Sequence, residues 1–308
     1  ATTAGNAAAT AYQEDGPWSA LDSVVFRDVN GELVNVSGYH LRLVNMYGGY
    51  LGTQVLDSSS ADATNIYRAL TGAGATGGSF RFHLFVPCGL NRRTLTGVLG
   101  NQDRAQKYSL RTDIAASGSI YSTAPTTLPP YIIARQYENY AVPAPTNANG
   151  VPQANLPVNW GVLHYITQSV SPSAPAGGST VNHYLSRLGN TIRLLILVVR
   201  QNGSRTSAES NMPTRIQFNL GDVPIFVEDT QYRRMLMWRR YGFDAPAGVL
   251  VYDFATDLLN MAGNELGDDW QFTNGLVNAQ FQITYPSGLG STNNSLTIIT
   301  EDLVIPPD

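Results

Sequence analysis

The chain lacks the residues on which several classes of protein depend. Its 308 residues include one cysteine, Cys88, which excludes an internal disulfide and any cysteine-rich metal site. No segment approaches the roughly 18 consecutive apolar residues of a membrane-spanning helix, and the longest apolar run, residues 194–199, has the length of a strand. No signal-peptide pattern opens the chain. The fold must therefore be held together by packing alone.

Charged residues are also scarce. They make up 14% of the chain, against about a quarter in typical proteins, and 19 basic and 23 acidic residues give a net charge of -4. Lys107 is the only lysine, and no block of basic residues occurs. This predicts a largely neutral, polar surface that does not bind nucleic acid directly.

The residues that are abundant favour an all-β fold. The 29 glycines and 17 prolines separate short apolar runs, which is typical of strands and turns. Asn30 and Gly31 predict a hairpin turn between two strands, since both tolerate a positive φ. We expect strands at residues 21–29, 32–36, 39–45, 79–86, 107–114, 131–140, 160–170, 180–188, 192–200, 214–220, 248–254, 279–285 and 295–304.

Two segments have helical patterns. Residues 62–70 could form two turns. A longer helix is predicted from Asp229 or Thr230, either of which can cap free amides, to Tyr241, where Gly242 can end it. Arg239 and Arg240 in its last turn suit the helix dipole. Because Met235, Trp238 and Tyr241 share one face, we expect this helix to cover its own sheet rather than an acidic partner or lipid headgroups.

A loose internal repeat predicts two domains of similar design. Residues 79–87 and 214–224 both alternate, end in Val-Pro and lead into an arginine pair, at 92–93 and 233–234. The proline-rich residues 141–157 cannot continue a central strand. We therefore expect a first domain at residues 1–145, with its N-terminal part incomplete, and a second at residues 146–308.

The candidate binding and catalytic motifs are better explained by ordinary structural roles. Gly72, Gly74 and Gly77 have dinucleotide-loop spacing, but a helix-like segment precedes them and a strand follows, the reverse of what phosphate binding requires. Cys88 lies five residues from its nearest histidine, which places the two side chains on opposite faces of an extended segment. The histidines are His40, His83, His164 and His183. None of them forms the closely spaced His-x-His pair that is typical of a metal site.

Carboxylates and glycosylation motifs give no stronger signal. The pairs at residues 268–269 and 301–302 are adjacent, whereas glycosidase acids face each other from separate elements. The sequence leaves open a catalytic pair of carboxylates contributed by residues that are distant in the chain. The N-x-[ST] motifs at Asn35, Asn202 and Asn293 are what chance predicts in an asparagine-rich chain. We expect no catalytic, cofactor-binding or metal-binding residues, and no cofactor.

Several ordered motifs resemble a known family of viral proteins. Residues 37–45, S-G-Y-H-L-R-L-V-N, are similar to the Ser-Gly-aromatic-His-Leu segment of tectivirus major coat proteins. Residues 74–77 (G-A-T-G), Val-Pro at 86–87 and Leu-Thr-Gly at 95–97 follow in the family's order. The arginine-rich helix then leads into residues 248–253, G-V-L-V-Y-D, as in that family. The resemblance covers nearly the whole chain, with gaps in the loops.

The resemblance implies a double jelly-roll, two eight-stranded β-sandwiches side by side with short helices in the connections. It further implies a structural major capsid protein of a tailless bacteriophage, not an enzyme. Its homotrimers would tile an icosahedral shell around an internal membrane, with neighbouring trimers, vertex and minor capsid proteins and the membrane as partners, in virions assembled in the bacterial cytoplasm. Members of this family begin with an amphipathic helix that reaches toward the membrane, and we expect this sequence to start after most of that region, or another element to complete the first roll. A hydrolase or amidase on paired jelly rolls, or a carbohydrate-binding spike, are the alternatives.

Overall fold

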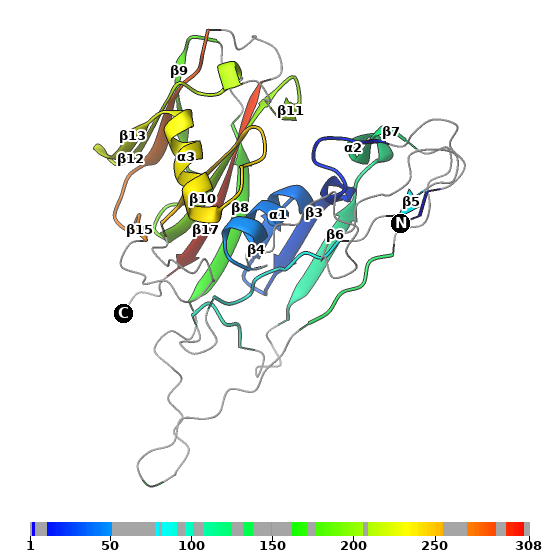
Figure 1. Cartoon of the computed structure of the whole chain (residues 1–308). Coiled ribbons are helices and arrows are strands. Elements are labelled where there is room, and N and C mark those ends of the chain that lie inside the picture. Colours follow the sequence, from blue (N-terminus) through cyan, green and yellow to red (C-terminus); the bar gives the residue numbers. More distant parts are fainter. Residues whose placement is uncertain are drawn as a thin grey trace.

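The computed structural model describes residues 2–3, 11–50, 78–79, 82–90, 96–100, 107–124, 132–137, 149, 162–171, 177–205, 209–254, 270–287 and 294–304. Most of its regular structure is strand (Figure 1). The longer elements are β3 (Leu21–Arg27), β4 (Glu32–Val36), α1 (Gly38–Tyr47), β6 (Ser109–Ile114), β8 (Leu163–Val170), β9 (Thr180–Tyr184), β10 (Thr191–Gln201), β12 (Arg215–Leu220), β13 (Val223–Glu228), α3 (Thr230–Tyr241), β14 (Val249–Asp253), β16 (Ala279–Thr284) and β17 (Ser295–Val304).

The remaining elements are short. They are β1 (Thr2–Thr3), β2 (Ala11–Tyr12), η1 (Trp18–Ala20), β5 (Gly78–Ser79), α2 (Ser117–Ile120), β7 (Tyr121–Thr123), β11 (Ser204–Arg205), η2 (Glu209–Asn211) and β15 (Gln271–Phe272). No helix among the described residues is long and apolar enough to cross a membrane.

Eight strands of the second half form two stacked sheets. One sheet has the order β8, β17, β10, β14, and the other has the order β9, β16, β12, β13. All pairings within the two sheets are antiparallel. The apolar side chains between them, including Phe218, Tyr252 and Phe281, form one core. Two sheets stacked over a shared core are a β-sandwich.

The first of these sheets continues into the first half of the chain. Strand β4 pairs with β8 in parallel through Val34–Ile166 and Asn35–Thr167, and β3 and β6 follow beyond it. Figure 1 shows β4, β3 and β6 extending away from the sandwich, with α1 lying over the junction. The halves therefore share a sheet as well as a core.

Strand β10 is buried on both faces because it lies in the middle of this arrangement. Leu194 and Ile196 contact the core shared with the first half, while Leu195 and Leu197 contact the core inside the sandwich. A strand covered on both sides needs apolar residues at every position. This explains the continuous apolar run at residues 194–199.

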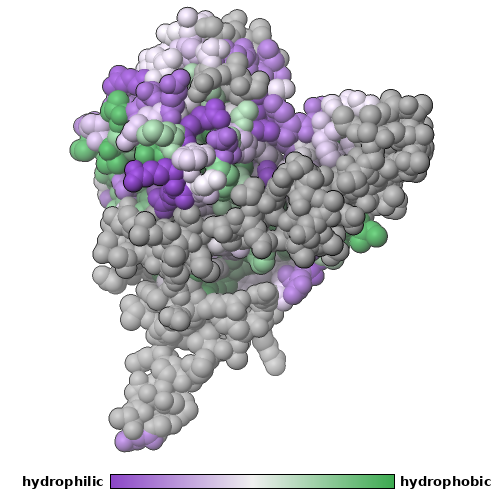
Figure 2. Space-filling view, viewed as in Figure 1, coloured by the Kyte–Doolittle hydropathy of each residue, from purple (hydrophilic) through white to green (hydrophobic). Residues whose placement is uncertain are grey.

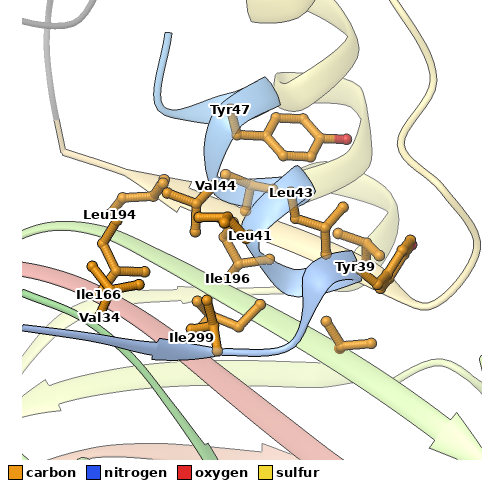
Figure 3. Packing of buried hydrophobic residues seen from close by; sticks show 14 of the residues in the cluster. Val34, Tyr39, Leu41, Leu43, Val44, Tyr47, Ile166, Leu194, Ile196 and Ile299 are labelled. Atoms are coloured by element: carbon orange, nitrogen blue, oxygen red, sulfur yellow. The ribbon is translucent and has the colours of Figure 1, made fainter. Parts of the chain in front are cut away.

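The strand predicted at residues 39–45 is wrong, because this segment is helix α1. Ser37 caps the helix by accepting a hydrogen bond from the amide of His40. Eight of the ten helix residues are buried, so the apolar pattern fits a helix as well as a strand, and the cap signal decides between them. Leu41 and Val44 point toward the sheet residues Leu194 and Ile196 (Figure 3).

Two further strand predictions are wrong over the described residues. Residues 82–87 and 132–137 form no strand. Within the first segment, the side-chain amide of Asn45 accepts a hydrogen bond from the amide of Phe85 at 2.8 Å and donates one to its carbonyl at 2.9 Å. A buried side chain thus makes the hydrogen bonds that a neighbouring strand would supply. The helix predicted at residues 62–70 lies outside the described residues.

The second predicted helix is confirmed as α3. Asp229 caps it by accepting from the amide of Tyr232 at 2.7 Å, Gly242 ends it with a φ of 74°, and Arg239 and Arg240 occupy its last turn. Its burial differs from the prediction. Met237 packs into the core, whereas Met235 and Trp238 are exposed. The helix therefore covers its own sheet through Met237 and Tyr241, and the predicted apolar face is only partly buried.

The repeated unit also differs from the predicted one. Val223 and Pro224 begin β13, whereas Val86 and Pro87 lie outside any strand, and the first arginine pair is not among the described residues. The structure instead repeats a hairpin followed by a capped helix, as β3–β4–α1 and again as β12–β13–α3. The predicted hairpin turn at Asn30 and Gly31 is confirmed.

Candidate functional sites

A buried group of polar side chains lies where the two halves meet. Glu301 on β17 accepts hydrogen bonds from Arg193 at 3.0 Å, from His164 at 2.9 Å and from the hydroxyl of Tyr50. Arg193 also donates to the carbonyl of Gly48 at 3.0 Å. We call Tyr50, His164, Arg193 and Glu301 the seam cluster. It joins the segment after α1 to three strands of the sandwich.

Glu301 is ionised despite having no exposed surface. Burial raises the pKa of its carboxyl group, but the charge of Arg193 and hydrogen bonds from His164 and Tyr50 lower it further, to about 2. Each oxygen of the carboxylate is therefore used by a fixed donor. A general acid or base would need an available proton position and access to substrate. The seam cluster has the geometry of a structural ion pair.

Asp302, the next residue, points to the opposite face of β17. It accepts hydrogen bonds from Asn190 and, at 3.4 Å, from Arg187. Burial raises the pKa of its carboxyl group, because these two partners offset only part of the desolvation. Glu301 and Asp302 therefore belong to separate environments. They do not face each other across a cleft as paired glycosidase acids do.

The other candidate residues are scattered over the structure. His40 contacts Gln168 at 2.5 Å, and His183 lies between Ser171 and Tyr285. Burial lowers the pKa of both histidines to about 4. His83 is exposed, and no group of metal-ligating side chains forms among the described residues. Burial raises the pKa of Cys88 to about 11, which makes its thiol a poor nucleophile.

Several sequence motifs lie outside the described residues. These are the glycines at 72, 74 and 77, the acidic pair at 268–269 and the glycosylation motif at 293. Of the other two such motifs, Asn35 lies on β4, where it is exposed and donates to Glu32 at 2.7 Å. Asn202 has a φ of 53° in the turn between β10 and β11.

An exposed apolar surface covers one flank of the sandwich. It is formed by side chains of β13 and α3 that are 40–62% exposed. Asp229 is the only residue between this strand and this helix. Figure 2 shows apolar atoms gathered over β13 and α3, interspersed with hydrophilic ones. We call this group the β13–α3 surface, and its members are Val223, Ile225, Val227, Tyr232, Met235 and Trp238. Exposed apolar patches of this kind mark interaction sites.

Two arginines on α3 add positive charge to this surface. Arg233 pairs with Glu228 and Arg240 with Asp253. Arg234 and Arg239 make no ion pair with the described residues. The combination of aromatic, methionine and arginine side chains is the one enriched in the centres of protein interfaces. The sequence placed Met235 and Trp238 on one helical face, but that face was predicted to cover the sheet.

Beyond β13, the outer face of the same sheet is almost uncharged. Alternation along β9, β12 and β16 turns amide and hydroxyl side chains outward, and Arg215 is the one formally charged residue among these positions. The outward residues are Thr180, Asn182, Tyr184, Arg215, Gln217, Asn219, Gln280, Gln282 and Thr284. This sheet face agrees with the neutral polar surface that the composition predicts.

Comparison with known proteins identifies the fold. No protein-family model matches the chain, and no curated protein matches its sequence. Among solved structures, the STIV major capsid protein, from Sulfolobus turreted icosahedral virus, matches 99% of this chain and 84% of its own, with 12% identity and a TM-score of 0.58. The chain has the double jelly-roll fold of viral major capsid proteins.

Two other double jelly-roll proteins match to a similar degree. VP54 of PBCV-1, in a structure fitted into a reconstruction of the virophage Sputnik, matches 98% of this chain and 84% of its own, with 12% identity and a TM-score of 0.58. The Faustovirus major capsid protein matches 97% of this chain and 73% of its own, with 11% identity and a TM-score of 0.58. The fold predicted from the sequence motifs is therefore confirmed.

Proposed function

We propose that this chain is a structural major capsid protein whose double jelly-roll subunits form the wall of an icosahedral virus. The observation that carries the proposal is the structural likeness, over at least 97% of the chain, to major capsid proteins of three viruses. The protein acts as a building unit of the virion and not as an enzyme. Its chemistry supports this role, since both oxygens of the buried Glu301 carboxylate have fixed donors and the neighbouring Asp302 lies on the opposite face of the strand.

The finer assembly follows from the same proposal. Two sandwiches in one chain let three copies form a tile of roughly hexagonal outline, and closed threefold symmetry avoids open filaments. Neighbouring tiles, vertex and minor capsid proteins and an internal membrane are the proposed partners in a phage virion assembled in the bacterial cytoplasm. The proposed domain boundary lies at residues 145–146. Lattice contacts between tiles can be weak singly because many act together.

Light scattering coupled to size-exclusion chromatography tests the proposal. Three chains of 33.3 kDa give a mass of about 100 kDa, and electron microscopy of the same sample should show tiles with threefold symmetry. A monodisperse particle of 33.3 kDa at micromolar concentration contradicts the proposal. Purified chain that hydrolyses glycans or amides would favour the enzyme alternative, and binding on a glycan array would favour the spike.

A further inference from the structure

The β13–α3 surface is built for side-chain packing rather than for the addition of a strand. Strand β13 is the edge of its sheet, and an edge strand normally offers its backbone to another chain. Here Pro224 lacks an amide hydrogen, and the register shifts between Phe218 and Asn219. Proline and a bulge are both devices that block edge pairing. The partner must therefore contact the exposed side chains.

The charge on α3 indicates what kind of partner this is. The helix contains four arginines and no acidic residue, a formal charge of +4 of which Arg233 and Arg240 are paired with Glu228 and Asp253, whereas the whole chain carries -4. The remaining residues of the chain therefore sum to -4 minus 4, or -8. A different region of a second copy can complement the helix. A symmetric contact between two α3 helices would instead bring Arg234 and Arg239 toward their own equivalents, where like charges repel.

We infer that the β13–α3 surface of one copy packs against a different, less basic surface of the next copy within the trimer. The inference rests on the proposed function and assigns a residue set to its subunit contact. Contacts between unlike surfaces close into a ring when the rotation between successive copies is 120°. Trp238 and Met235 act as the apolar anchors at the centre, and Arg234 and Arg239 select the orientation of the partner.

Matched substitutions test this contact in the full chain by light scattering and sedimentation velocity. Trp238→Glu and Arg239→Glu should each weaken association at least tenfold, which shifts the population toward 33.3 kDa. The controls are Val29→Glu and Lys107→Glu, which likewise replace one apolar and one basic side chain with glutamate at exposed positions of the first half and should leave association unchanged. Because all four side chains lie on the described surface, circular dichroism should show the same fold for every variant.

A cysteine variant tests whether the contact joins unlike surfaces. Met235→Cys places a thiol at the centre of the surface, while native Cys88 stays poorly reactive because its pKa is about 11. Oxidation should give no disulfide-linked dimer. A linked dimer would show that two α3 helices face each other and would overturn the inference.

The outcomes separate this inference from the proposed function. A wild-type trimer with unaffected Trp238→Glu and Arg239→Glu variants would assign the surface to another occupant, such as a different shell protein. That result overturns the inference and leaves the proposed function standing. A wild-type monomer overturns both. Weakened association in these two variants, with both controls unchanged, supports both.

Discussion

Replacing Glu301 with glutamine should destabilise the protein by about 3 kcal/mol at pH 7. The substitution preserves shape but leaves Arg193, which is 3% exposed, without its counter-charge. Removing one member of a buried ion pair typically costs about 3–5 kcal/mol, because the other charge stays desolvated. The pKa gives a second route to the magnitude. A change from 4.5 to about 2, at 1.36 kcal/mol per pH unit, corresponds to about 3 kcal/mol.

Urea unfolding followed by circular dichroism measures this effect, at one fixed protein concentration because association contributes to stability. Glu32→Gln is the matched control. Glu32 pairs with Arg27 at 3.0 Å on the surface, so its loss should cost less than about 1 kcal/mol. The double variant Glu301→Gln/Arg193→Met removes the uncompensated charge. Its loss in free energy of unfolding should be smaller than the sum of the losses of the two single variants.

The pH dependence of the same variant has a definite sign. The pKa of Glu301 is lower in the folded state, so its contribution to stability is complete above about pH 4.5 and is lost as pH falls toward 2. The wild-type protein should therefore lose more stability than the variant between pH 5 and pH 2, in the range given by these two pKa values. A variant within about 1 kcal/mol of wild type at pH 7, or an unchanged acid response, would refute the role assigned to the seam cluster.

Three further substitutions test other parts of the structure by the same unfolding measurement. Asp302→Asn should cost less than about 1 kcal/mol at pH 7 or stabilise the protein, because burial raises the pKa of this carboxyl group and penalises its charge; a loss of about 3 kcal/mol would contradict this. Gly38→Ala should cost about 1–3 kcal/mol, since its new Cβ would lie 2.4 Å from the carbonyl oxygen of Trp18; wild-type stability would show that the helix start can shift freely. Asp229→Ala should cost about 1 kcal/mol by leaving the Tyr232 amide uncapped, whereas Asp229→Asn should retain most of that stability.

Local signals in the sequence predicted local structure well. Asp229 and Gly242 bound α3, and the Asn30–Gly31 turn joins β3 to β4, because caps and turns depend on neighbours in the chain. Signals of burial were less specific. Residues 39–45 alternate like a strand but form a helix buried on most sides, where periodicity no longer separates the two states.

The seam cluster shows the limit of reasoning from sequence. Glu301 was considered as one of an adjacent acidic pair, but its partners Tyr50, His164 and Arg193 lie 251, 137 and 108 residues away. No spacing rule connects residues at such distances. The antiparallel pairing of β8, β17 and β10 brings His164, Glu301 and Arg193 together, and the first half, joined through the pairing of β4 with β8, adds Tyr50.

Composition and turn signals determined the all-β class, because they depend on patterns that recur along the chain. The double jelly-roll was implied by the resemblance of ordered motifs to a known family of coat proteins. The tertiary structure alone decided which apolar faces are covered. Met235 and Trp238 share a face that any amphipathic helix would turn inward, yet Met237 takes the place against the core and leaves them exposed. Burial depends on which elements pack against a helix, and the sequence of the helix alone does not specify them.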